Sequence, residues 1–273
     1  MAKIRNSGTI INTDYLAGKL IEGSITDLAI PSSTTYVRAY AFYKNTGLTS
    51  VKVPKSVKKI DTEAFNGCSG LTNIVFEENG VEIINAYCFS SCNSLREIRL
   101  PNGLTTLGTQ AFERMASLKK IIIPKTLVNI DRFQTIGSPQ FSYLIIESPN
   151  DFFGRGSNYA FAATLLRLLD IRSAINAYDL TGSGITANSV TLYINVPDNL
   201  YDEFTAFAGW NKLSLKQFVH SCDKVSFEEI ENPIDGDYYS LKGDTNYLNP
   251  LGEKQIDIRQ YVGGSWVEVD IDA

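Results

Sequence analysis

Three of the four cysteines have a spacing that suits metal chemistry. Cys88 and Cys92 lie four residues apart in "AYCFSSCNSL" (86–95), and Cys68 precedes them. Thiolates at short spacing bind Zn²⁺, so this group is a candidate metal site. A different explanation holds if the same positions recur elsewhere in the chain, because a repeated structural slot accounts for a buried cysteine without any metal.

The single histidine suggests a second kind of chemistry. His220 and Cys222 stand two residues apart in "HSC", and a Cys-His pair is the minimum for a thiol nucleophile. Residues two apart on a strand or loop seldom orient each other's side chains, and no oxyanion-hole signature accompanies this pair. We therefore predict no catalytic residue here.

Paired carboxylates favour a third hypothesis, a glycan-active enzyme, because glycosidases need two carboxylates a fixed distance apart. The pairs are Glu77-Glu78, Glu228-Glu229 and Asp235-Asp237. Adjacent acids on turns are usually solvated, so an enzyme that uses acids of the C-terminal part stays an alternative. Asp235, Asp237 and Asp244 lack the spacing of an EF-hand calcium loop, and "GSGIT" (182–186) lacks the Lys-Ser/Thr of a phosphate loop. We predict no metal site and no cofactor.

A seven-residue template recurs six times: an apolar anchor, two residues, an apolar residue, one residue, an apolar residue and usually Pro. The copies are "ITDLAIP" (25–31), "LTSVKVP" (48–54), "LTNIVFE" (71–77), "LREIRLP" (95–101), "LKKIIIP" (118–124) and "FSYLIIE" (141–147). Their anchors are 23, 23, 24, 23 and 23 residues apart. The 24-residue unit holds its extra residue in "EENG". We expect a loop there, because an insertion in a strand would turn every later side chain to the other face.

Further positions keep the same register, and they account for the cysteines. The slot of Cys68 and Cys92 is filled in sister units by Asn45, Met115 and Ser138. The slot of Cys88 is filled by Ala41, Ala64 and Ala111, each followed by Phe. We therefore expect buried packing residues with free thiols. Because Cys68 and Cys92 would lie on adjacent turns, near the ~5.5 Å Cα separation of a disulfide, a bridge stays open in an oxidising place.

The repeat predicts a solenoid, because a unit with one short strand cannot bury its apolar face alone and must stack on its neighbours. The units resemble the BspA-like, bacterial surface antigen type of leucine-rich repeat, roughly "LxxIxIPxxVxxIxxxAFxxCxx". The best match is "LTSVKVPKSVKKIDTEAFNGCSG" (48–70), and the resemblance covers residues 25–147 with weaker echoes to 222. It implies an α/β, mostly β fold: a right-handed leucine-rich-repeat solenoid of about six 23-residue units with helical caps.

Four parts are expected along the chain. They are an N-terminal cap (1–24) with a short helix over 12–23, the repeats (25–147), an irregular terminal repeat with the C-terminal cap (148–222), and a small acidic β module (223–273). Residues 158–171 predict an amphipathic helix or cap insertion. Residues 192–210 resemble the family's closing strand, Val-Pro turn and helix. In the β module, "KQIDIRQYV" and "SWVEVDI" predict a hairpin at Gly263-Gly264, and "GGSWVEVDI" resembles the ends of phage tail and fibre modules.

Alternation along each strand turns two columns of residues outward, onto the exposed face of the sheet. From these columns we predict a binding surface of Lys52, Val75, Arg99, Lys120, Ile122, Tyr143 and Ile145. Ile122, Tyr143 and Ile145 form an apolar and aromatic patch within it. Exposed patches of this kind usually have an occupant. We expect either a foreign ligand or a cover supplied by the C-terminal module or another subunit.

Charge and hydropathy limit the partners. The net charge is −5 and the pI about 5.1, so nucleic acid is not expected as a partner. Residues 223–273 hold twelve acids and four bases, a charge of −8, which leaves +3 for residues 1–222. No segment approaches the ~20 apolar residues of a membrane span, so we expect no membrane insertion. The chain as given has no apolar run that would serve as a signal peptide.

These observations favour a non-catalytic recognition or structural protein on a virion or cell surface. BspA-like repeats imply adhesion, and the C-terminal ending favours a phage virion component of the tail, fibre or receptor-binding kind. Its partners would be a protein or glycan ligand on a host surface, or neighbouring virion proteins, and a homo-oligomer is left open. The first alternative is a bacterial cell-surface adhesin whose signal peptide has been removed. The second is the glycan-active enzyme.

Overall fold

The computed structural model describes residues 26–131, 133–134, 138–150, 161–162, 166–174, 176, 192–206, 216–222, 224, 226–241 and 257–270. The predicted N-terminal cap (1–24) lies outside the described residues. So do Asp244 and much of the predicted C-terminal cap (148–222).

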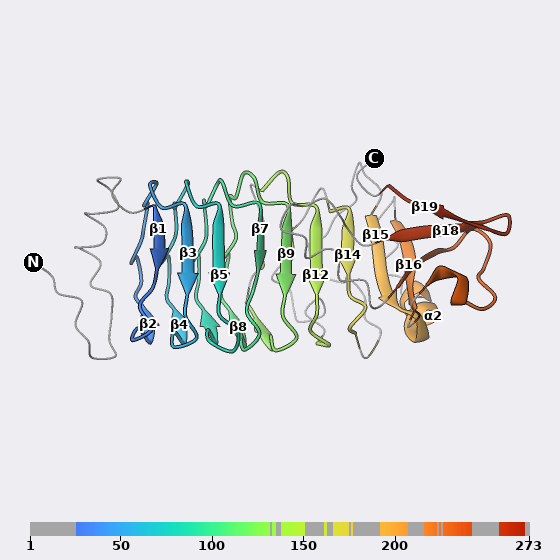
Figure 1. Cartoon of the computed structure of the whole chain (residues 1–273), viewed down its shortest axis with the longest axis horizontal. Coiled ribbons are helices and arrows are strands. Elements are labelled where there is room, and N and C mark those ends of the chain that lie inside the picture. The colour runs from blue at the N-terminus through green and yellow to red at the C-terminus, as the bar shows by residue number, and fades with distance from the viewer. Residues whose placement is uncertain are drawn as a thin grey trace, which may run out of the picture.

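The six template segments form parallel strands that stack along the long axis of the molecule (Figure 1). They are β1 (Asp27–Ala29), β3 (Ser50–Val53), β5 (Asn73–Phe76), β7 (Glu97–Arg99), β9 (Lys120–Ile123) and β12 (Tyr143–Ile146). Paired neighbours are one unit apart in register, so that Ser50 pairs with Asn73 and Lys120 with Tyr143. The predicted alternation is found in β1, β3, β5 and β7, and β5 runs exposed, buried, exposed, buried, but β9 and β12 are buried on both faces over most of their length. The predicted leucine-rich-repeat solenoid is confirmed, and the protein is mostly β.

A second parallel sheet closes the other side of each turn. Its two-residue strands are β2 (Tyr36–Val37), β4 (Lys59–Ile60), β6 (Ile83–Ile84), β8 (Thr106–Leu107) and β10 (Asn129–Ile130), in the order β10-β8-β6-β4-β2. The core lies between the two sheets, and a stack of phenylalanine rings is part of it. Phe42, Phe65, Phe89 and Phe112 follow one another with ring centroids 4.9, 5.5 and 5.9 Å apart. The phenylalanine position of four successive units thus forms a continuous apolar column in the core.

The main sheet continues past the predicted repeats. Strands β14 (Leu168–Asp170), β15 (Leu192–Pro197), β16 (Lys216–Cys222) and β17 (Tyr238–Leu241) add to β12 in parallel. The strands β18 (Ile258–Val262) and β19 (Ser265–Glu268) follow as an antiparallel hairpin, as predicted, with positive φ at Gly263 and Gly264. The predicted division at residue 223 stays a prediction, but the sheet itself runs across it through β16 and β17. A short two-stranded sheet joins β11 (Phe133–Gln134) to β13 (Phe161–Ala162).

Helix is scarce in the described part of the chain. The helix predicted over 158–171 is wrong where the structure describes it, because Leu168–Asp170 is a buried strand that pairs with two neighbours. The strand and helix predicted from 192 are found as β15, followed by the 3-10 helix η1 (Asp198–Leu200) and α2 (Tyr201–Ala206). The strand does not close the array, however, because β16 and β17 extend the sheet beyond it. A 3-10 turn, η3, spans Phe227–Glu229. None of these described helices has the length and apolar character to cross a membrane.

A carboxylate ties three successive turns together beside the second sheet. Asp61 accepts hydrogen bonds from the Tyr36 hydroxyl, the Asn85 amide and the Thr62 backbone N–H. Burial acts to raise the pKa of the Asp61 carboxyl, but these bonds and the Lys59 ammonium outweigh burial and hold the pKa below its ordinary value of 3.8. The charged form of Asp61 is therefore favoured in the folded protein.

Replacing Asp61 should remove part of the acid sensitivity of folding. A lowered pKa contributes stability above the pKa of the unfolded chain, and this stability is lost as pH falls through and below 3.8. We expect Asp61→Asn to lower the free energy of unfolding by about 1–3 kcal/mol near neutral pH, with a smaller deficit in acid. Urea unfolding followed by circular dichroism from about pH 7 to pH 3 measures both. The exposed Asp27→Asn variant is the control, and a deficit independent of pH would contradict the linkage.

Candidate binding surface on the sheet face

The main sheet is interrupted between β5 and β7. Strands β1, β3 and β5 form one hydrogen-bonded sheet, and β7 begins a separate nine-stranded sheet. Figure 1 shows a wider space between β5 and β7 than between the other neighbouring strands. The interruption coincides with the one 24-residue unit, which connects these two strands.

The extra residue of that unit lies in the loop after β5, as predicted. Asn79 has a φ of 57° and donates its N–H to the Asn102 carbonyl across 2.8 Å. A Cβ on Gly80 would meet the Cα of Lys55 at 2.7 Å, so only glycine lets the loop approach the turn before it. The insertion is thus absorbed outside the strands, and the side chains of β7 keep their proper faces.

A cleft of about 330 Å³ opens on the sheet face at the interruption. It is lined from β5, β7, β9 and the adjoining loops, and it combines apolar groups with charged ones. The outward-facing lining residues are Asn73, Val75, Glu97, Arg99, Lys120 and Ile122. Glu97 and Lys120 form an ion pair across 2.8 Å, so within the cleft their charges largely satisfy each other.

Arg99 is the cleft residue whose hydrogen bonds are incomplete. Its Nη2 donates to both carboxylate oxygens of Glu147, at 2.9 and 3.1 Å, which carries the guanidinium across β9. Its Nη1 is buried and has no hydrogen-bond partner. Leaving a buried donor unsatisfied costs about 1–3 kcal/mol, more for a charged group. The guanidinium of a residue that lines the cleft therefore keeps a buried nitrogen without a partner.

The predicted binding residues divide into an open group and a covered group. Lys52 is exposed beside Glu77, with 3.2 Å between Nζ and the carboxylate, and the Val75 side chain is 47% exposed. The prediction of an exposed patch at Ile122, Tyr143 and Ile145 is wrong, because these residues are only 3%, 8% and 2% exposed.

The cover on Tyr143 comes from the C-terminal part of the chain. Tyr143 packs with Leu168, Val219 and Ile258 in a small apolar cluster on the outer side of the sheet. Ile258 belongs to β18, so the C-terminal part of the chain covers Tyr143. This agrees with the expectation that the C-terminal module, and not a foreign ligand, covers the patch. The face open to a ligand consequently runs from β1 to the cleft and does not extend to β12.

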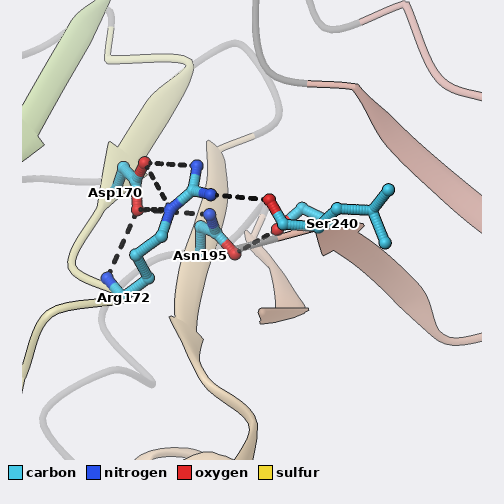
Figure 2. Close-up of polar contacts among 5 residues, drawn as sticks. Asp170, Arg172, Asn195 and Ser240 are labelled. Atoms are coloured by element: carbon cyan, nitrogen blue, oxygen red, sulfur yellow. Dashed lines mark hydrogen bonds and ion pairs between the residues drawn. The ribbon is translucent and has the colours of Figure 1, made fainter. Parts of the chain in front are cut away.

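A buried polar network fastens this end of the solenoid (Figure 2). Arg172 forms an ion pair with Asp170, with 2.7 Å between Nη2 and Oδ2, and its Nη1 donates to the Leu241 carbonyl at 2.9 Å. The Asn195 amide donates to Asp170 and accepts from the Ser240 hydroxyl, at 3.1 and 2.8 Å. The network connects β14 and β15 to β17, so it positions the C-terminal module on the repeats.

His220 is enclosed in a way that prevents it from acting on Cys222. The imidazole lies between the rings of Tyr201 and Tyr239, with centroids 3.4 and 4.7 Å away. Its Nδ1 and Nε2 face the carboxylates of Asp198 and Asp237, at 2.7 and 3.3 Å. Both ring nitrogens are therefore engaged, and the contacts join η1, β16 and the turn before β17. Sequence spacing could not reveal them, because every partner comes from another turn.

The cysteines have the properties of packing residues. All four described thiols are free and buried, so no bridge joins Cys68 to Cys92. The Sγ atoms of Cys68 and Cys92 donate to the carbonyls of Phe42 and Phe65, one turn back, at 3.0 and 3.2 Å. Burial raises the pKa of Cys68 and of Cys222 to about 12, which leaves neither as a thiolate at neutral pH.

The carboxylates of the enzyme hypothesis are engaged in structural contacts. Asp235 accepts a hydrogen bond of 2.6 Å from the Gly263 N–H at the hairpin turn, and Asp237 faces His220. No group of three or more His, Cys, Asp or Glu side chains suited to a metal ion occurs among the described residues. These contacts give the C-terminal acids a role in holding β17 and the hairpin in place.

Comparison with known proteins agrees with the repeat architecture. Residues 21–136 match, in six copies, the family described as BspA type Leucine rich repeat region. This stretch of the chain is therefore similar to BspA-type leucine-rich repeats. No protein of curated function matches the sequence.

Three solved structures illustrate the similarity. A leucine-rich repeat protein from Bacteroides capillosus is 28% identical over 36% of this chain and 75% of its own, with a TM-score of 0.33. The leucine rich repeat protein of T. pallidum is 18% identical over 69% of this chain and 87% of its own, at 0.43. The pneumococcal vaccine antigen PcpA is 17% identical over 72% of this chain and 42% of its own, at 0.38.

Removing the cation of the buried network should destabilise the C-terminal end. Arg172→Leu leaves Asp170 buried without its counter-ion, so we expect a loss of about 3–5 kcal/mol. The loss should appear in urea unfolding, together with faster proteolysis between β16 and β19. Lys52→Leu, which breaks an exposed ion pair, should cost no more than about 1 kcal/mol. Equal losses in the two variants would show that the network does not fasten this end.

Proposed function

We propose that the protein is a non-catalytic recognition protein, displayed on a cell or virion surface, that binds a protein or glycan at the sheet-face cleft. The observation that carries this proposal is the buried, unpartnered Nη1 of Arg99 beside an opening in the sheet. Solenoid folds hold no chemistry of their own, and their function depends on the sites that they present.

The chemistry of the cleft limits what the ligand presents. Arg99 already binds one carboxylate through Nη2, and its Nη1 carries two further N–H donors, which suit an acceptor oxygen of a carboxylate, carbonyl or hydroxyl group. Val75 and Ile122 supply apolar wall beside it. A small polar group on an apolar stem would fit this combination.

Two features of the chain bear on the surface that would display the protein. The BspA-type repeats favour a bacterial cell surface, since the type takes its name from a surface antigen. The phage virion hypothesis is supported by the resemblance of the β18–β19 hairpin to tail and fibre modules. Co-purification with virions at a fixed copy number would favour the virion, and recovery from the washed bacterial cell envelope would favour the adhesin.

A charge placed in the cleft should abolish binding without unfolding the protein. The probes are an array of host glycans and a panel of purified extracellular proteins, screened with the labelled wild-type chain. For each ligand found, we expect Val75→Asp to weaken binding at least about tenfold. The new carboxylate would repel the ligand's acceptor oxygen and would compete with it for the Arg99 guanidinium. Val128→Asp is a matched control, since Val75 and Val128 are both 47% exposed and only Val75 lines the cleft.

Arg99→Gln provides the second test of the same site. This substitution removes the guanidinium. A ligand that uses the Nη1 donor should therefore bind the Arg99→Gln variant as weakly as it binds the Val75→Asp variant. Binding that survives both changes would place recognition elsewhere on the molecule. Absence of any ligand across both panels would count against the recognition role itself.

A further inference from the structure

A second hollow lies away from the sheet face, on the turns that lead from the second sheet back to the main sheet. It has a volume of about 550 Å³ and is built from the same turn in four successive units. We call it the tyrosine trough. Its lining residues are Tyr43, Lys44, Glu63, Asn66, Tyr87, Ser90, Ser91, Gln110, Glu113 and Arg114.

The shape of the trough follows from which residues fill two neighbouring slots. One slot holds Tyr43, Asn66, Ser90 and Glu113, and the next holds Lys44, Gly67, Ser91 and Arg114. Large side chains stand in the first and fourth units, and smaller ones stand in the two units between them. Three strand spacings of ~4.8 Å separate the outer units, so the floor is ~14 Å long along the solenoid axis.

The backbone at the second slot favours glycine, yet the walls carry long side chains. Lys44, Ser91 and Arg114 have φ of 56°, 61° and 56°, and Gly67 has 76° in the same slot. A left-handed conformation costs a residue other than glycine roughly 1–2 kcal/mol. The same left-handed turn recurs in all four units, so Lys44 and Arg114 stand in a slot that the repeat also fills with Gly67 and Ser91.

The polar side chains of the trough are held in fixed positions. The Tyr87 hydroxyl donates to Gln110 Oε1 at 2.6 Å, and Asn66 Nδ2 donates to Glu63 Oε2 at 3.0 Å. Tyr43 is 41% exposed, with the Lys44 ammonium 5.1 Å from its ring centroid. The trough therefore offers a partly exposed aromatic ring beside oriented amides and a carboxylate.

We infer that the tyrosine trough is a binding site for a neutral oligosaccharide that lies along the solenoid axis. Two acids, Glu63 and Glu113, and two bases, Lys44 and Arg114, line it, which gives zero net charge and favours a neutral ligand. A sugar offers an apolar C–H face for Tyr43 and hydroxyl groups that both donate to and accept from amides and carboxylates. An apolar peptide would find little apolar wall here, and a polyanion would meet as many acids as bases.

The experiment uses the full chain against a panel of neutral oligosaccharides, with sialylated and sulfated oligosaccharides as the charged comparison. We expect neutral members to bind with Kd at or below about 1 mM, measured by saturation-transfer NMR and titration calorimetry. Tyr43→Ala should weaken binding at least about tenfold, and Gln110→Ala should weaken it by a smaller factor. Unchanged thermal unfolding of both variants excludes misfolding as the cause.

Variants elsewhere separate this site from the sheet-face cleft. Val75→Asp and Val128→Asp lie outside the trough and should bind neutral oligosaccharides as the wild type does. Binding lost in Val75→Asp but kept in Tyr43→Ala would assign the glycan to the cleft and overturn the inference. No binding of any neutral oligosaccharide, or binding of the charged ones alone, would also overturn it.

Discussion

The structure depends on one constraint: a unit of this chain cannot bury its own apolar face. Each of the first five units supplies a strand of three or four residues in the main sheet and a strand of two residues in the second. Such pieces are too short to be stable alone, so their backbone hydrogen bonds and apolar side chains are satisfied by the turns before and after. The stacked rings of Phe42, Phe65, Phe89 and Phe112 show the result, since each ring packs on its predecessor. Polar groups follow the same rule, because Asp61 is held by Tyr36 one turn earlier and Asn85 one turn later.

Stacking also explains why the candidate sites lie where the repetition changes. The extra residue near Asn79 and Gly80 coincides with the separation of β5 from β7 and with the sheet-face cleft. At the tyrosine trough the second sheet is paired without interruption from β2 to β8, and the hollow comes from a change of side-chain size from Tyr43 to Ser90 and back to Glu113. An array of identical units would present an even ridge in both places. Both candidate sites therefore lie at departures from the repeat.

At the C-terminal end of the array, buried polar contacts supplement the stacking of apolar side chains. Beyond β12 the paired strands are 25, 25 and 24 residues apart, as Tyr143 to Leu168, Leu168 to Tyr193 and Tyr193 to Gln217 show. With the register no longer fixed by a repeated slot, buried polar contacts hold the strands. Arg172 and Asp170 secure β17, and His220 with its two carboxylates secures the turn before it. The hairpin then covers Tyr143 through Ile258, which ends the open face.

The sequence by itself determined the solenoid, the strands of the six units, the slots of the cysteines and the position of the extra residue. It could do so because each of these features is a local pattern repeated about every 23 residues. A pattern that would be weak in a single copy becomes clear when six copies keep the same register. Only the tertiary structure decided that Ile122, Tyr143 and Ile145 are covered, that Leu168–Asp170 is a strand, and that Arg99 keeps a donor free. Each of these depends on contacts between residues whose separation is not the 23-residue period of the template: Tyr143 with Ile258, Leu168 with Tyr193, Arg99 with Glu147. The sequence pattern indicates which face of the sheet a residue is on. The path of later segments of the chain decides what packs against that face.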